Sequence, residues 1–147
     1  MAELKIEEKS LDELQEYKNN PRKNKKAIEA VKKSIQKFGF VNPVIITEDG
    51  VILAGHTRVK AAKAAGVEKV PVIVLHHLTE QEAKAFRIAD NRASDFTTWD
   101  DAMLKNEMES LDVDDWADFG FSKKFLEDIK VGTTCTCPKC GKTFEEF

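Results

Sequence analysis

The spacing of apolar residues along this chain alternates between the period of a strand and the period of a helix. Alternating apolar and charged residues at 4–8, and apolar runs at residues 43–47, 51–53 and 70–75, predict strands. Between residues 25 and 38, apolar side chains recur at helical spacing while lysines occupy the other faces, which predicts an amphipathic helix.

Two further helices are expected among the later strands. The alanine-rich segment from Arg58 to Ala65 predicts a short helix that ends at Gly66. Thr79 and Glu82 have the spacing of a capping box, so a helix is expected from there to about Arg92.

The chain changes character after Ser94. A helix with an apolar face is expected from Trp99 to Leu111, and Ser122 is expected to cap a last helix that ends near Lys130. Aspartates are abundant between these helices. We interpret them as solvated charge around aromatic side chains that dock on the body, rather than as a metal site.

The stretch from Val51 to Ala62 joins a short strand to a helix through a single glycine, Gly55. The first N–H groups of a helix have no partner inside it and the helix dipole is positive there, so such a junction is suited to an anion. Glycine allows a close approach to the backbone, and Arg58 can supply a bidentate clamp. We therefore expect a phosphate-binding site here.

Length and charge limit the classes of protein to consider. At 147 residues, the chain is long enough for one compact domain with an appendage. It has no apolar run that could span a membrane, and residues 1–8 are charged where a secretory signal would be apolar, so we expect a cytoplasmic protein without a membrane partner. The net charge of −3 argues against coating nucleic acid by bulk charge. Residues 18–37 are nevertheless strongly basic, which leaves open both a solvated helix face and a weak contact with DNA.

All three cysteines lie near the end of the chain, which is not the distribution of a disulfide framework. Cys137 and Cys140 form the C-x-x-C half of a zinc-ribbon site, and Cys135 would be a third ligand. The fourth ligand would be His76, His77 or a residue of a second chain. A remnant of a longer zinc ribbon and a reducible cysteine pair are the alternative interpretations.

Five motifs of this chain, taken together in their order and spacing, resemble the N-terminal domain of the ParB and sulfiredoxin superfamily. They are Asn20-Pro21-Arg22, residues 38–44, residues 54–58, residues 70–74 and residues 89–92. The resemblance covers about residues 4–95. It is strongest to the versions found in bacteriophages and mobile elements, which are often joined to DNA-modification methyltransferases.

The resemblance and the residue pattern together divide the chain into three expected parts. By the resemblance, residues 1–95 would form a small α/β (α+β) fold, a ParB/sulfiredoxin-like mixed sheet with packed helices. Residues 96–131 would form an acidic helical extension, and residues 132–147 a short zinc-knuckle-like tail.

The resemblance also implies a ligand, since the superfamily motif binds the phosphates of CTP in partition ParB proteins and of ATP in sulfiredoxins and related serine kinases. The residues carried over by motif are Arg22, Gly55, His56, Thr57, Arg58, Asn91 and Arg92. Arg22 also has an ordinary interpretation as a surface charge, and the cluster at residues 90–92 as helix capping. DNA or a DNA-modifying protein is the implied partner, and a homodimer is compatible with the resemblance.

Departures from the superfamily narrow these expectations. Sulfiredoxins carry a catalytic cysteine at the glycine-arginine motif, which this chain lacks, so we do not expect sulfinic-acid reduction. Residues 56–58 replace the glutamate and arginine pair usual in partition proteins, which leaves the nucleotide open between CTP and ATP. The region after Ser94 is too short for the DNA-reading and dimerisation domains of a partition protein, so centromere binding is not expected.

Two classes of function follow. The first is a nucleotide-phosphate-binding module that acts in DNA-associated processes of a phage or mobile element. The second is a magnesium-dependent nuclease or phosphotransferase that uses the same pocket, for which the candidate catalytic residues are Asp90, Glu48 and His56. Each has a second interpretation: Asp90 as a helix cap, Glu48 as a turn residue, and His56 as a hydrogen-bond donor to the anion.

Overall fold

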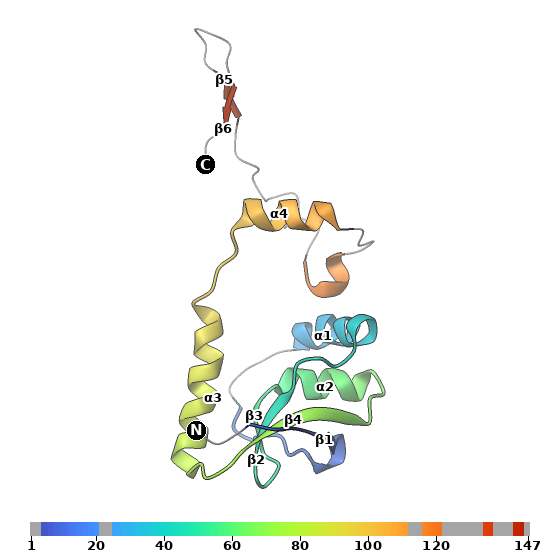
Figure 1. Cartoon of the computed structure of the whole chain (residues 1–147), viewed down its shortest axis with the longest axis vertical. Helices are drawn as coiled ribbons and strands as arrows, with labels where there is room; N and C mark the ends of the chain where they lie inside the picture. The colour runs from blue at the N-terminus through green and yellow to red at the C-terminus, as the bar shows by residue number, and fades with distance from the viewer. Residues whose placement is uncertain (1–3, 21–24, 112–115, 122–133, 137–142, 146–147) are drawn as a thin grey trace. The chain divides into compact units, whose positions relative to one another are not determined.

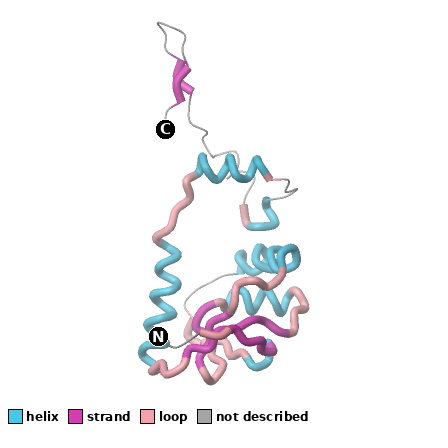
Figure 2. Tube along the Cα trace, in the orientation of Figure 1, coloured by secondary structure: helices cyan, strands magenta, loops and turns pink. Residues whose placement is uncertain are grey.

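The computed structural model describes residues 4–20, 25–111, 116–121, 134–136 and 143–145. Its elements are β1 (Ile6–Ser10), η1 (Leu11–Glu13), α1 (Lys25–Phe38), β2 (Val44–Thr47), β3 (Ile52–Ala54), α2 (His56–Ala64), β4 (Lys69–Leu75), α3 (Glu80–Asp95), α4 (Asp101–Ser110), η2 (Trp116–Phe119), β5 (Thr134–Thr136) and β6 (Thr143–Glu145) (Figures 1 and 2). The chain divides into two compact units, Met1–Thr97 with Asp118–Gly120, and Thr98–Ala117 with Phe121–Phe147.

The first unit is built on a four-stranded mixed sheet with the strand order β1-β4-β2-β3. The central strands β4 and β2 run parallel, with Val44 opposite Val72. Both outer pairs are antiparallel, and Ile6 of β1 lies opposite Ile73 of β4. All four segments predicted as strands contribute a strand to this sheet, which confirms the predicted fold class.

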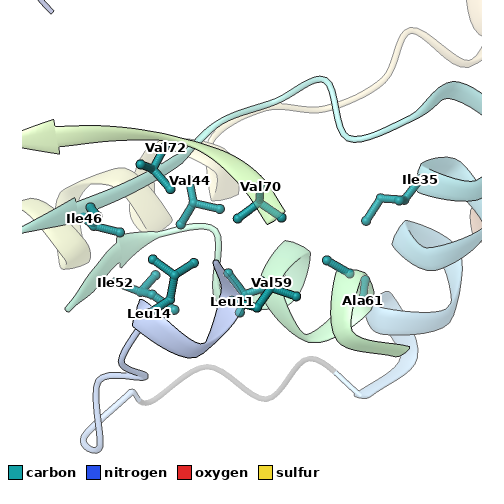
Figure 3. Packing of buried hydrophobic residues seen from close by; sticks show 11 residues of the cluster. Leu11, Leu14, Ile35, Val44, Ile46, Ile52, Val59, Ala61, Val70 and Val72 are labelled. Atoms are coloured by element: carbon teal, nitrogen blue, oxygen red, sulfur yellow. The ribbon is translucent and has the colours of Figure 1, made fainter. Parts of the chain in front are cut away.

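The hydrophobic core lies between this sheet and α2. The alternation of β2 and β4 points Val44, Ile46, Val70 and Val72 toward one face, where each is fully buried. Other members of the core are Leu11, Leu14, Ile35, Ile52, Val59, Ala61 and Ala62 (Figure 3). The alanines of α2 let it pack closely on the sheet, and α1 packs against α2 in turn (Figure 1).

The observed bounds, faces and caps of the helices match those predicted from the sequence to different degrees. The bounds of α1 are those predicted, and its end is closed by the Gly39 N–H, which donates to Ile35 O at 2.8 Å. Phe38, which was predicted on the apolar face of α1, is 58% exposed, because the side that meets the core ends at Ile35. The capping box of α3 is confirmed, with the Thr79 N–H donating to Glu82 Oε2 at 2.8 Å.

The second unit contains the helix predicted near residues 99–111. It is α4, which Asp100 caps by accepting from the Met103 N–H at 2.9 Å. Met108 is buried, whereas Leu111, predicted on the same face, is 52% exposed because it follows the end of the helix.

The tail contains an antiparallel pair, β5 and β6, which the sequence pattern did not predict. Cys135 lies in β5. Cys137, Cys140 and the helix predicted at 122–130 fall outside the described residues. Within the described ranges, no three His, Cys, Asp or Glu side chains are grouped to hold a metal ion. No helix in the described part of the chain is both long and apolar enough to cross a membrane.

Candidate functional site at the start of α2

Gly55 connects β3 to α2 in a conformation that favours glycine. It is the N-cap of α2 and has φ +106° and ψ 17°, in the left-handed region. A Cβ atom at this position would lie 3.2 Å from both Nε and Nη2 of Arg58. The guanidinium therefore folds back over the glycine at the helix N-terminus, and a larger residue would push it away.

Arg58 is held in this position by its surroundings. Its Nη1 donates to Asn42 O at 3.1 Å. Burial lowers the pKa of Arg58, and the negative charge of Asp90 acts in the opposite direction. Because an arginine keeps its proton at all ordinary pH values, the Arg58 guanidinium is a fixed positive charge beside the first turn of α2.

A cavity of about 1100 Å³ opens over this junction. Its described lining includes four basic residues, Lys25, Lys26, Arg58 and Lys60, of which Lys60 also pairs with Glu16 at 3.1 Å. Asp90 supplies the carboxylate in the same described lining. Positive side chains and a positive helix end thus surround the cavity, an arrangement that suits a polyanion.

Most residues singled out from the sequence meet at this cavity. Those that line it are Gly55, His56, Thr57, Arg58, Asp90 and Asn91. Arg92 does not line it; it lines an adjoining cavity, where its guanidinium lies 3.5 Å from Asp95 Oδ2 and 4.4 Å from the centroid of the Phe96 ring. Arg22 lies outside the described residues.

Glu48 lies apart from this cavity. Its Oε1 is 2.9 Å from His76 Nδ1 and accepts from the His77 N–H at 3.3 Å. These contacts, with that to His76 first, lower the pKa of Glu48. The carboxylate therefore holds the turn after β2 to the segment after β4.

His56 is buried, with 9% of its surface exposed, and its Nε2 accepts from the Tyr17 N–H at 3.4 Å. Burial lowers the pKa of His56; Glu16 opposes this effect, while Arg87 and Lys60 add to it. Nε2 is thus an acceptor, and the expected donation by His56 to an anion stays a prediction. His56 joins α2 to the segment around Tyr17.

The adjoining cavity, of about 480 Å³, reveals a residue that the sequence analysis did not select. Arg87 lines it from α3 and is only 9% exposed. Its Nε donates to Ile52 O at 3.2 Å, and its Cζ lies 3.7 Å from the centroid of the Tyr17 ring. Helical periodicity could have identified Arg87, because it stands four residues after the buried Ala83 and four before Asn91, on the same face of the helix.

Comparison with known proteins agrees with this fold. The chain matches the ParB N-terminal domain family over residues 2–111. It is 44% identical over 80 residues to the ParB-like nuclease domain-containing protein YnaK of Escherichia coli K12, which covers 54% of this chain and 92% of YnaK. It is 32% identical over 82 residues to a probable plasmid-partitioning protein ParB of Thermus thermophilus, covering 54% of this chain but only 27% of that relative.

Among solved structures, the fold resembles a C-terminally truncated chromosome-partitioning protein ParB from Caulobacter crescentus, complexed with CTP-gamma-S. The TM-score is 0.67 at 21% identity, and the match covers 85% of this chain and 76% of the other. The family match spans more than half of the chain and includes the sheet, the glycine-arginine junction and α3. The chain therefore belongs to the ParB N-terminal domain family.

Proposed function

We propose that this chain is a nucleotide-binding module whose phosphate site is the cavity over the N-terminus of α2. Gly55 and the first turn of α2 receive the phosphates, Arg58 clamps them, and Lys25 and Lys26 neutralise the remaining charge. The module acts in a DNA-associated process of a phage or mobile element, such as DNA modification, partition-like segregation or evasion of host defence.

One observation carries this proposal: the Arg58 guanidinium packs closely over Gly55, 3.2 Å from the place that a Cβ at this position would take. This packing places a fixed cation and a helix N-terminus at the same cavity. Binding of CTP-gamma-S by the Caulobacter protein of the same fold supports the choice of a nucleoside triphosphate. Arg22, from the segment next to Lys25, is proposed as a further ligand.

Thermal shift measurements with CTP, ATP and ADP test the proposal. We expect at least one nucleotide to raise the melting temperature of the full chain, and Arg58→Ala to weaken its binding by at least about tenfold, since a hydrogen bond to a charged group contributes about 1.5–3 kcal/mol. Lys63→Ala is the matched control, because it removes one positive charge from an exposed position on the same helix. No shift at saturating nucleotide would overturn the proposal.

A second function, a magnesium-dependent nuclease or phosphotransferase, is favoured by the position of Asp90. Its carboxylate lines the phosphate cavity and its charge acts on Arg58. Magnesium is commonly held by one or two carboxylates together with the phosphates of the substrate, and Asp90 fits this requirement. The ion would neutralise charge that develops on a transferring or leaving phosphate group.

Measuring cleavage of nucleotide or DNA distinguishes this second function from the first. If the chain is an enzyme, cleavage of nucleotide or DNA in the presence of magnesium is lost in Asp90→Asn, whereas Glu48→Gln, remote from the cavity, keeps it. If the chain is a binding module, nucleotide binds without turnover in both variants and in the unchanged protein.

The cysteine tail is proposed as a zinc site. Cys137 and Cys140 stand in the sequence between β5 and β6, the place of the C-x-x-C half of a zinc ribbon. Zinc that co-purifies with the full chain and is lost in Cys137→Ser would support the site. A metal-free preparation that keeps its full thermal stability would exclude it.

A further inference from the structure

The short segment Asp118–Gly120 packs on α1, although the two are distant in sequence. It belongs to the same compact unit as this helix. Asp118 Oδ1 lies 3.4 Å from Lys33 Nζ. The ring of Phe119 lies 5.8 Å from that of Phe38, measured between centroids, with 31° between the two planes. The segment thus brings a carboxylate and an aromatic ring to one surface of α1.

That surface of α1 is basic and carries an aromatic side chain. The helix contains a single acid, Glu29, and the lysines Lys25, Lys26, Lys32, Lys33 and Lys37. Lys37 Nζ lies 5.7 Å from the centroid of the Phe38 ring and 5.5 Å from that of Phe119. Lys33, Lys37 and Phe38 line neither of the two cavities near the start of α2. This surface is therefore separate from the nucleotide site.

The contacts between the segment and α1 are of a weak kind, because they face solvent. The side chains of Lys33 and Asp118 are 49% and 48% exposed, and Phe38 is 58% exposed. Ion pairs between exposed side chains contribute little to stability and are screened by salt. A ligand with more negative charge than one carboxylate can therefore displace the segment.

The two groups that the segment presents are those of a nucleic acid strand. A strand offers a phosphate to a lysine and a base to an aromatic ring, where the segment offers the carboxylate of Asp118 to Lys33 and the ring of Phe119 to Phe38. Proteins that bind single strands combine a positive surface along the backbone with aromatic side chains on which bases stack. Bases in a duplex are already stacked on each other, so Phe38 favours a single strand.

We propose that Lys33, Lys37 and Phe38 form a contact surface for single-stranded DNA, and that the segment Asp118–Gly120 is an intramolecular cover that competes with the strand. Asp118 takes the place of a phosphate and Phe119 the place of a base. The strand binds when the cover opens, so the apparent affinity is reduced by the fraction of molecules in which the cover is open. This surface does not depend on the proposed nucleotide site.

Fluorescence anisotropy of a labelled oligo-thymidine strand, with the full chain at low salt, tests the proposal. Phe119→Ala removes the ring of the cover without changing the charge of the chain, and Asp118→Asn removes its carboxylate. The matched control is Asp101→Asn, which changes the net charge equally at an exposed position of α4. Phe38→Ala, added to Phe119→Ala, removes the stacking surface once the cover is weakened. Thermal melting of each variant shows that it is folded.

We expect Phe119→Ala and Asp118→Asn each to bind the strand about threefold more tightly than the unchanged chain, or better, because the cover is open in more molecules. Asp101→Asn should have a smaller effect than Asp118→Asn. The added Phe38→Ala should then weaken binding by about fivefold or more, the least effect expected from losing a base stack.

Three results would overturn the proposal. The first is an equal gain in affinity in Asp118→Asn and Asp101→Asn, which would show an effect of net charge alone. The second is a Phe119→Ala variant that binds the strand no better than the unchanged chain, or that binds a duplex of the same length as tightly as the strand. The third is lack of binding in every variant, which leaves the nucleotide site standing because titrations with CTP and ATP measure that site separately.

Discussion

At the scale of single residues, the phosphate site depends on one glycine and one arginine three positions later. Gly55 has a positive φ, and the Arg58 guanidinium lies 3.2 Å from the position of a Cβ at residue 55. The sequence could predict this pair, because the glycine conformation and the contact with Arg58 involve residues only three positions apart. Arg87 could not, because its burial depends on Tyr17 and Ile52, which are distant in sequence.

Replacing Gly55 by alanine tests the close packing of this pair. Both Gly55→Ala and Gly66→Ala place a Cβ at a positive φ, which costs about 1–2 kcal/mol of unfolding free energy in each case. Nothing lies within 4 Å of a Cβ at Gly66, whereas the Gly55 Cβ would meet Arg58. Urea unfolding should therefore show similar losses, while only Gly55→Ala lowers nucleotide affinity by about tenfold or more. Equal nucleotide affinity in the two variants would contradict this account of Gly55.

His56 should make stability depend on pH. Its folded pKa lies below the ordinary value of about 6.5, because burial favours the neutral ring and Arg87 and Lys60 act in the same direction against Glu16. In the window below about 6.5 the unfolded chain binds more protons, so stability is complete above this pH and declines as pH falls toward the folded pKa.

The measurement is urea unfolding at several pH values between about 7.5 and 5. His56→Gln is the matched control, because glutamine can still accept from the Tyr17 N–H but does not titrate. We expect the unchanged protein to lose more stability than His56→Gln as the pH falls. Parallel profiles would show that His56 does not carry the effect.

At the scale of elements, local signals decided which segments were predicted well. The apolar period of α1 and the capping box of α3 gave the start of both helices, because each signal lies within a few residues. The helix expected after Gly55 begins at His56, with the left-handed Gly55 as its N-cap. The β5–β6 pair was missed, because three-residue strands have too few positions to show a period.

The cap of α3 has a measurable consequence, because this helix carries Arg87, Asp90 and Asn91. Thr79 accepts from the Glu82 N–H at 3.3 Å, and Thr79→Ala should lower the unfolding free energy by about 1 kcal/mol. Thr97→Ala is the control, because its hydroxyl donates to Ser94 O beyond the end of the same helix and its loss should change stability by less than about 0.5 kcal/mol. Equal effects of the two substitutions in denaturant unfolding would count against the capping role.

At the scale of the whole chain, the arrangement of the sheet brings distant segments to one site. The strand order β1-β4-β2-β3 was not predictable from the sequence pattern, because pairing between distant strands leaves no local signal. That order places the end of β3 and the start of α2 where residues 17–20 and the later half of α3 also meet. The resemblance to known motifs predicted that these segments meet, and the structure adds the adjoining cavity that Arg87 lines.

The most direct test of the central claim is an NMR titration of the full chain, labelled with ¹⁵N, with CTP and with ATP in the presence of magnesium. The account predicts saturable shifts of the backbone amides at residues 55–58 and of the Arg58 Nε–H signal, with the same amides shifting in response to tripolyphosphate. It predicts no comparable shifts around Glu48 and His76. Nucleotide-induced shifts that leave residues 55–58 unchanged would contradict a phosphate site at the start of α2.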